Sequence, residues 1–162
     1  MLTEDVLQAI DESVLCWLAT ADADGTPNVS PKEMFVAFGD SHLLIANIMS
    51  PGSARNVRVN PNVCVSFVHV FKEKGFKLRG TARYLKSSDD GFEERAKPLR
   101  EMAGERFPFK TLFEIEVTAV EPILAPSYRL YPDEVTEQSK IAGALRLYRV
   151  KELLDGVSGD NA

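Results

Sequence analysis

SHLLIANIMSPGSARNVRVNPNVCVSF, residues Ser41–Phe67, is the stretch that decides the fold. Residues 41–48 are apolar and predict a buried strand, and Ser50–Gly52 has the proline and glycine of a tight turn. Ser53 stands where a cap would begin a helix of about two turns, which Asn60–Pro61 ends before a second strand. A helix start presents unpaired backbone N–H groups and partial positive charge. This loop and its hydroxyl are therefore suited to hold a phosphate.

Length, composition and charge limit the classes of protein that the chain can represent. Its 162 residues, 44% of them hydrophobic, predict one domain with a closed core. The net charge of -5 argues against nucleic acid or an anionic membrane as the main partner. No apolar run reaches the roughly 20 residues of a membrane span, and the N-terminal region is too acidic for a signal peptide. We therefore expect a cytoplasmic protein that binds no nucleic acid and no membrane.

The cysteines and histidines do not form a recognisable reactive centre. Cys16 and Cys64 lie in apolar strand-like segments without Cys-x-x-Cys spacing, and both are expected to be buried free thiols. His42 and His69 have no cysteine or carboxylate at metal-ligand spacing, so we expect no metal site. The sequence also lacks a Gly-x-Ser-x-Gly elbow, a phosphate loop ending in Gly-Lys-Ser/Thr and a Gly-x-Gly-x-x-Gly motif.

Six strands are predicted, most of them joined by tight turns. They cover residues 14–21, 27–38, 41–48, 62–71, 76–86 and 111–124. In the last strand, Glu114, Glu116 and Thr118 alternate with apolar residues and are expected on an exposed face. Closing such a sheet removes its edges, so the pattern predicts a small antiparallel barrel. An open α+β sheet is the alternative.

Three longer helices and one short helix complete the prediction. The short helix follows Ser53, and the others cover 3–12, 88–105 with a Ser88 cap and a break at Pro98, and 136–148. Residues 126–131 are expected as an aromatic loop and 157–162 as a segment that frays. The chain is thus expected to be a single domain over 1–162, with a helical C-terminal extension from about residue 126. The last helix would cover the sheet or a partner subunit.

Polar residues interrupt one strand, and basic residues gather on another. Ser30–Glu33 lie inside the strand expected over 27–38, and proline removes a ladder donor there. Two interpretations stay open: a plain edge strand with solvated charges, or a site where another group takes the hydrogen bonds. The basic residues over 72–79 are typical of a solvated face, with a second phosphate contact or a dimer seam as alternatives.

Five motifs in order carry a resemblance to a known family. They are Ala-Thr-x5-Gly-x-Pro-x-Val-Ser-Pro at 19–31, Leu-Leu-Ile-Ala-Asn at 43–47, Ala-Arg-Asn-Val at 54–57, Asn-Pro-x-Val at 60–63 and Gly-Thr-Ala-Arg at 80–83. Over about residues 10–125 the chain resembles the FMN-binding split barrels related to pyridoxamine 5'-phosphate oxidase. The resemblance implies a mainly β fold with helices, a six-stranded antiparallel split β-barrel, and a homodimer with FMN at its interface.

The resemblance also implies which residues bind the cofactor. Ser53 and Asn56 would lie near the phosphate, and Asn47 and Ile48 beside the flavin. Further along the ring or the ribityl chain would lie Ser30, Pro31 and Lys32. Many relatives have arginine or lysine in the loop where this chain has Pro51–Ser53, so Arg55 or Lys32 would have to supply the positive charge.

The function that the resemblance implies is an FMN-dependent oxidoreductase acting on a small molecule. Flavin would carry the redox chemistry, and Lys32 would stabilise the anionic reduced ring at its N1 and C2 carbonyl edge. One alternative is an FMN-binding carrier or sensor without a substrate, which the lack of an evident acid-base residue favours. Another is a cofactor-free or heme-binding barrel of the same fold.

Overall fold

Seven antiparallel strands make up one sheet in the computed structural model, which describes residues 1–104 and 107–159. Their order in the sheet is β2-β1-β5-β6-β7-β4-β3. The strands are β1 Cys16–Ala21, β2 Pro27–Lys32, β3 Phe35–Phe38, β4 His42–Ala46, β5 Asn62–His69, β6 Lys74–Lys86 and β7 Thr111–Leu124. Within the described residues the helices are α1 Glu4–Glu12, α2 Pro51–Val59, α3 Phe92–Ala103, α4 Ser127–Leu130, α5 Glu137–Leu147 and α6 Val150–Gly159.

The sheet curls into a barrel because its two edge strands are consecutive in the chain. β2 forms one edge and β3 the other, yet Glu33 and Met34 alone join them. Two residues can connect the edges only where the edges lie close together, so the sheet closes on itself. The expected antiparallel split barrel is confirmed. The single strand expected over 27–38 is wrong, because the chain leaves the sheet at Glu33–Met34, and the barrel has seven strands rather than six.

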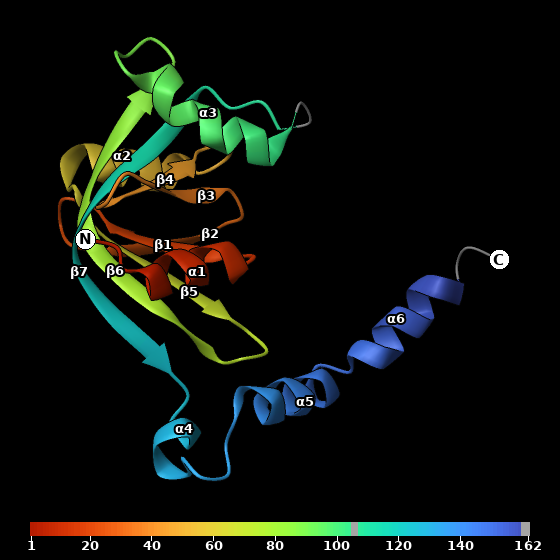
Figure 1. Cartoon of the computed structure of the whole chain (residues 1–162). Coiled ribbons are helices and arrows are strands. Elements are labelled where there is room, and N and C mark those ends of the chain that lie inside the picture. The colour runs from red at the N-terminus through yellow and green to blue at the C-terminus, as the bar shows by residue number, and fades with distance from the viewer. Residues whose placement is uncertain (105–106, 160–162) are drawn as a thin grey trace.

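Two apolar clusters hold this frame together. Fully buried Leu18 belongs to the cluster inside the barrel, to which α1 and α2 contribute Val6 and Val57. The second cluster lies under α3, at the top of Figure 1, where Leu99 packs with Leu44 of β4. The barrel therefore fixes the positions of the β2 end, the β4 end and the start of α2 relative to one another.

Gly80 marks a position where two strands approach too closely for any side chain. The register between β6 and β7 shifts at Gly80, and a Cβ atom there would lie 2.0 Å from the backbone oxygen of Glu116. Gly80→Ala is expected to lower the free energy of unfolding by about 3 kcal/mol, because the backbone cannot yield without opening the ladder. Urea unfolding measures this, with Gly143→Ala on α5 as the control, since no neighbour lies within 4 Å of that position. Equal stabilities for the two variants would contradict the close approach.

Two expectations for α3 are wrong. The helix begins at Phe92 rather than after a Ser88 cap, and Pro98 does not divide it. Phe92 and Leu99 are buried on either side of Pro98 and pack in the same cluster. Their packing holds both halves on the sheet and outweighs the hydrogen bond that proline removes. The expected helix end at Glu105 lies outside the described residues.

The C-terminal residues form more helix than the sequence predicts. The segment expected as a loop over 126–131 contains α4, and residues 157–159, expected to fray, belong to α6. The rest of that segment, 160–162, lies outside the described residues. α5 agrees with its prediction, and Thr136 and Ser139 form a capping box at its start. Neither these helices nor any other in the described part of the chain is long and apolar enough to span a bilayer.

Two residues differ from the expected exposure. Glu116 is exposed as the strand pattern predicts, but Glu114 is 2% exposed because Arg83 and Arg95 both pair with it. Glu114 lies on the face of β7 that α3 covers, opposite to core residues Phe113 and Ile115, and a carboxylate can be buried there when two guanidinium groups satisfy it. Cys16 is buried as expected. Cys64 is half-buried rather than buried, and both thiols are free.

Candidate functional site

Lys32 is a buried cation at the end of β2 without an acidic partner. The residue is 8% exposed, its Nζ donates a hydrogen bond to Ser50 Oγ, and none of the described carboxylates pairs with it. Burial lowers the pKa of Lys32 below the usual lysine value, and neighbouring Cys16 opposes this in part. A buried charge without a counter-charge is costly. The position therefore favours an anion.

The register of β2 explains how a lysine comes to be buried here. β2 pairs with β1 on one side, so that Lys32 lies opposite buried Cys16 and Pro31 opposite Trp17. Pro31 costs the sheet no ladder bond on the outer side of this edge strand. Because side chains alternate along a strand, Lys32 shares the inward face with Cys16. The interpretation of β2 as an edge strand is thus correct. Its further expectation, that the charges on this strand are solvated, is wrong for Lys32, which is buried.

α2 begins beside Lys32, and its cap is not the expected one. The helix starts at Pro51 with Ser50 at the N-cap, so Ser53 lies inside the first turn and is 1% exposed. The Ser50 side chain makes no capping hydrogen bond, because its hydroxyl accepts from Lys32. Pro51 has no N–H to offer, and the first N–H groups of the helix are those of Gly52 and Ser53. The helix start and the lysine bring positive charge to the same point, Ser50.

Ser53 and Asn56 point from α2 toward β1 and β2. Ser53 Oγ lies 3.0 Å from Ser30 Oγ and accepts a hydrogen bond from Asn28 Nδ2 at 3.2 Å. Asn56 Nδ2 donates to Thr20 Oγ1 at 3.1 Å. These uncharged contacts hold α2 on the two strands and so fix the position of Ser50. A direct phosphate contact by Ser53 or Asn56 stays a prediction, as does a contact of Ser30 with the ring or the ribityl chain.

Asn47 has an acceptor that no described group satisfies. Its backbone N–H donates to the carbonyl oxygen of Thr111 at 3.0 Å, and its Nδ2 donates to Thr111 Oγ1 at 3.0 Å. Asn47 Oδ1 is buried and lacks a hydrogen-bond partner among the described residues. Leaving a buried carbonyl oxygen unpaired costs free energy. This atom therefore favours a ligand that brings an N–H or O–H donor.

A cavity of about 460 Å³ opens beside Lys32. Its polar lining includes Lys32, Glu33 and Ser50. The apolar lining comes from the end of β2 and its connection to β3, from the loop after β4, and from the end of α3 and the segment after it. It includes Pro31, Met34, Ile48, Met49, Met102 and Phe107. A volume of this size with a few polar groups on one side is typical of sites for ring-containing ligands. The structure thus brings together Pro31, Lys32 and Ile48 of the predicted site.

Several residues that line this cavity were not predicted from the sequence. Met102 and Phe107 reach it from the end of α3, and Met34 reaches it from the connection between the two edge strands. No motif marks such residues, because tertiary packing alone brings them to the loop after β4. The sequence offers one signal, because Met102 continues the apolar stripe of α3. In the structure this side chain is 53% exposed, beyond the part of the helix that the core covers.

Two arginines line a smaller cavity of about 320 Å³ at the same loop. Arg55 and Arg58 project from α2 there, together with Asn47 and Tyr84. Arg55 is exposed and forms no ion pair with any described residue, whereas the Arg58 guanidinium lies 4.4 Å from the centroid of the Tyr84 ring. Sequence reasoning named Arg55 but missed Arg58. The loop therefore has cations on both sides, although its own sequence has none.

The histidines and the basic cluster lie outside this arrangement. Neither His42 nor His69 lines the cavity beside Lys32. Among the residues that the structure describes, no three histidine, cysteine or acidic side chains are grouped to hold a metal ion. The basic residues over 72–79 are partly exposed, as expected of a solvated face, and they also form ion pairs. Lys77 Nζ lies 2.8 Å from Glu121, for example, which weakens the idea of a second phosphate contact there.

Comparison with known proteins identifies the family. A family model described as pyridoxamine 5'-phosphate oxidase matches residues 2–124. The chain belongs to the pyridoxamine 5'-phosphate oxidase family, and its barrel is a split barrel of that kind. The match covers every strand and stops before α4, so the helical extension lies outside the part that the family model describes.

Individual relatives are distant. An uncharacterized protein of Methanocaldococcus jannaschii is 27% identical over 90 residues, which span 54% of this chain and 59% of the relative. The structure of an FMN-binding protein from Syntrophomonas wolfei matches with a TM-score of 0.64 at 15% identity, covering 76% of this chain and 87% of that chain. HutZ, the heme storage protein of Vibrio cholerae, matches with a TM-score of 0.58 at 23% identity, covering 76% and 94%. The two structural likenesses show the fold alone.

Proposed function

We propose that this chain binds FMN and acts as a flavin-dependent oxidoreductase on a small molecule. The observation that carries the proposal is Lys32, a buried cation beside the start of α2 with no acidic partner among the described residues. FMN is anionic, and its ring edge bears carbonyl oxygens and an N–H group. The residues present therefore fit it at Lys32, because FMN would supply the counter-charge that this buried lysine lacks.

Each residue of the site has a role in this proposal. FMN, when bound, supplies the redox chemistry by taking up and returning electrons or a hydride. Lys32 and Ser50 would hold an oxygen of the ligand, and the lysine charge would stabilise negative charge on a reduced ring. Asn47 lines the smaller cavity, which shares Ile48, Met49 and Ser50 with the larger one, and would lie beside the flavin from that side. The methionines and Phe107 would exclude water from the cavity.

The proposal includes a cytoplasmic homodimer with the flavin between two protomers. Ile48 and Met49, at the mouth of the cavity, are 47% and 88% exposed. Large apolar side chains at a site mouth favour coverage by another protein surface. The free thiols of Cys16 and Cys64 fit a reducing compartment.

Two other functions compete with a flavin-dependent oxidoreductase: an FMN carrier or sensor, and a heme-binding protein. A carrier or sensor that binds FMN without turnover is supported by the scarcity of proton-transfer groups: of the described cavity-lining residues, Lys32 and Glu33 are the ones that ionise. The likeness to HutZ suggests heme binding as another function, but neither His42 nor His69 lines the cavity, where a histidine could ligate heme iron. The FMN proposal accounts for the unpaired lysine, which the heme proposal does not require.

A fluorescence titration tests the proposal. FMN emission is expected to change on addition of the protein and to saturate at one FMN per chain, with a Kd below about 10 µM. Unchanged emission with the protein at 1 mM would overturn FMN binding. If the protein binds FMN, steady-state turnover with NADH or NADPH and an electron acceptor distinguishes the two FMN-binding functions. Turnover is expected of an enzyme, and no turnover is expected of a carrier or sensor. Hemin added in parallel is expected to give no stoichiometric absorbance change.

A further inference from the structure

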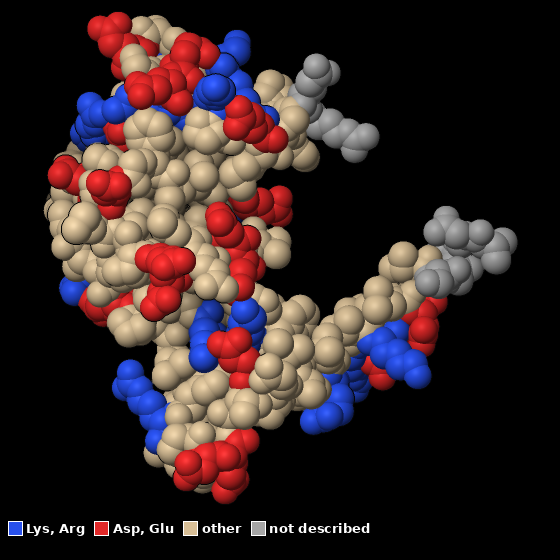
Figure 2. Space-filling view, viewed as in Figure 1, with Lys and Arg blue, Asp and Glu red and all other residues tan. Residues whose placement is uncertain are grey.

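The last two helices form an arm that stands away from the barrel. The arm is defined here as α5 and α6, residues 137–159. It leaves the lower end of the barrel and extends outward, so that an open concave space lies between α6 and the barrel (Figures 1 and 2). A helix extended in this way has a face that the barrel of its own chain does not reach.

α6 turns an apolar face toward this concave space. Its apolar residues recur at the spacing of one helix face and are Val150, Leu153, Leu154 and Val157. Leu153 is 64% exposed and Val157 is 69% exposed. Figure 2 shows the side of the arm that faces the barrel as uncharged, with Lys and Arg on its outer side. An isolated helix of ten residues is marginal in water, so α6 needs a surface on which this face packs.

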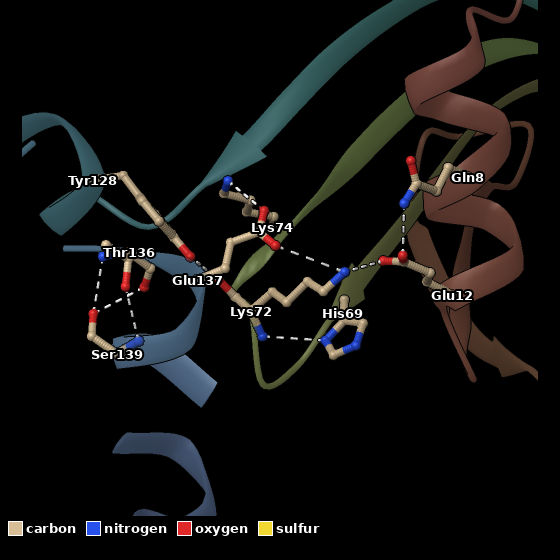
Figure 3. Close-up of polar contacts among 9 residues, drawn as sticks. All are labelled: Gln8, Glu12, His69, Lys72, Lys74, Tyr128, Thr136, Glu137 and Ser139. Atoms are coloured by element: carbon tan, nitrogen blue, oxygen red, sulfur yellow. Dashed lines mark hydrogen bonds and ion pairs between the residues drawn. The ribbon is translucent and has the colours of Figure 1, made fainter. Parts of the chain in front are cut away.

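The base of the arm is fixed rather than free (Figure 3). Lys72, in the turn between β5 and β6, donates to Glu12 of α1 at 2.6 Å, and Lys74 donates to Glu137 of α5 at 2.8 Å. The Tyr128 hydroxyl of α4 donates to the carbonyl oxygen of Lys72 at 2.9 Å. The hydrogen bond from Lys74 lowers the pKa of Glu137, which keeps its carboxylate charged at neutral pH. The start of α5 is therefore held on the barrel, and α6 continues from the far end of α5.

The barrel also exposes apolar side chains, and they are continuous with the arm. Val14, Trp17 and Val70 are 80%, 47% and 52% exposed and surround a hollow of about 420 Å³. Phe71 lines the same hollow, and its ring meets that of Tyr148, at the end of α5, edge to face with centroids 6.1 Å apart. We call Val14, Trp17 and Val70 the Trp17 face. One continuous apolar surface thus runs from the Trp17 face to the arm.

We propose that the arm wraps around the barrel of a second copy of this chain, whose barrel fills the concave space and packs on the Trp17 face. This inference rests on the proposed dimer and assigns part of its interface. A second copy fits because one chain carries both surfaces that such a contact needs, an apolar helix face and an apolar barrel face. In a two-fold dimer each arm covers the partner's barrel, and the contact closes without further copies.

Sedimentation equilibrium of the full chain tests the arm. The wild type is expected at twice the 18.0 kDa mass of one chain. Leu153→Asp with Val157→Asp places two charges on the apolar face and is expected to raise the dimer dissociation constant at least 100-fold. Arg146→Gln with Lys151→Gln makes the same change of net charge at exposed polar positions and is expected to change it less than threefold. Circular dichroism and the thermal midpoint show whether the barrel stays folded in each variant.

Trp17 provides a second readout because it is the one tryptophan in the chain. Its emission is expected to be blue-shifted in the wild-type dimer and to shift red on dilution, and to be red-shifted in the double aspartate variant at every concentration. An aspartate variant that stays as dimeric as the control, with unchanged emission, overturns the role of the arm while the proposed dimer stands. A wild type that is monomeric at all concentrations overturns the dimer itself.

Discussion

Replacing Lys32 by methionine is expected to weaken FMN binding about 100-fold, because the variant removes the charged hydrogen-bond donor of the site while keeping its apolar stem. Equilibrium titration of the purified variant with FMN measures this. Lys97→Met is the matched control, since Lys97 lies on the exposed side of α3 and does not line the cavity beside Lys32. Its affinity is expected to stay within about twofold of the wild type.

The same substitution is expected to act in the opposite direction on stability. Without ligand, Lys32 is a buried charge with no counter-charge among the described residues, so Lys32→Met should unfold at an equal or higher urea concentration than the wild type. Because burial lowers the pKa of Lys32, the wild-type affinity for FMN should fall as pH rises through that lowered pKa. The methionine variant should lack this pH dependence. A variant that binds FMN normally would remove Lys32 from the site.

Replacing Glu114 by glutamine is expected to lower the free energy of unfolding by about 3 kcal/mol, the lower end of the range for breaking a buried ion pair. Glu114 accepts hydrogen bonds from Arg95 Nε at 2.5 Å and Arg83 Nε at 3.1 Å, and it joins β6, β7 and α3. The lower value applies because the Arg83 side chain is 65% exposed and water can solvate it. Urea unfolding at pH 7 measures the difference. Glu116→Gln, exposed on the same strand, is expected to cost less than about 0.5 kcal/mol.

The pH dependence of this difference has a definite sign. Burial raises the pKa of Glu114, but the hydrogen bonds from Arg95 and Arg83 outweigh burial and hold the pKa below its usual value of 4.5. A carboxyl whose pKa is lower in the folded state stabilises the fold above its unfolded pKa. That stabilisation is lost as pH falls through the folded pKa. The gap between wild type and Glu114→Gln should therefore be full near pH 7 and shrink below pH 4.5, whereas a gap independent of pH would contradict the ion-pair account.

Local patterns in the sequence were sufficient to predict most of the strands and helices of the fold. The strand over 111–124 has the predicted bounds because its alternation reflects one face turned to the core. The order of strand, loop, helix and strand over 41–67 also agrees, but the loop covers residues 47–50, and Pro51 and Gly52 begin α2 instead of forming the predicted turn. The break at Glu33–Met34 could not be predicted locally. It exists because the two edges of the closed sheet meet there, which depends on the pairing of all the other strands.

The candidate site, like the fold, could be predicted from the sequence only in part. Lys32 and Ser50 are neighbours in space because an edge strand and a helix start meet, and the sequence showed both elements but not their contact. The sequence predicts Ser53 as the cap, yet the helix begins two residues earlier, at Pro51, with Ser50 as the cap. Met102 reaches the cavity from a distant helix. The sequence pattern thus indicated two of the segments that line the cavity, while tertiary packing decided which side chains face it.

A crystal structure of the protein grown with FMN is the measurement that tests the central claim most directly. The account predicts FMN in the cavity between the end of β2, the loop after β4 and the end of α3. An oxygen of the ligand should lie within hydrogen-bonding distance of Lys32 Nζ. FMN bound elsewhere on the chain, with Lys32 still bonded to Ser50 alone, would contradict the account.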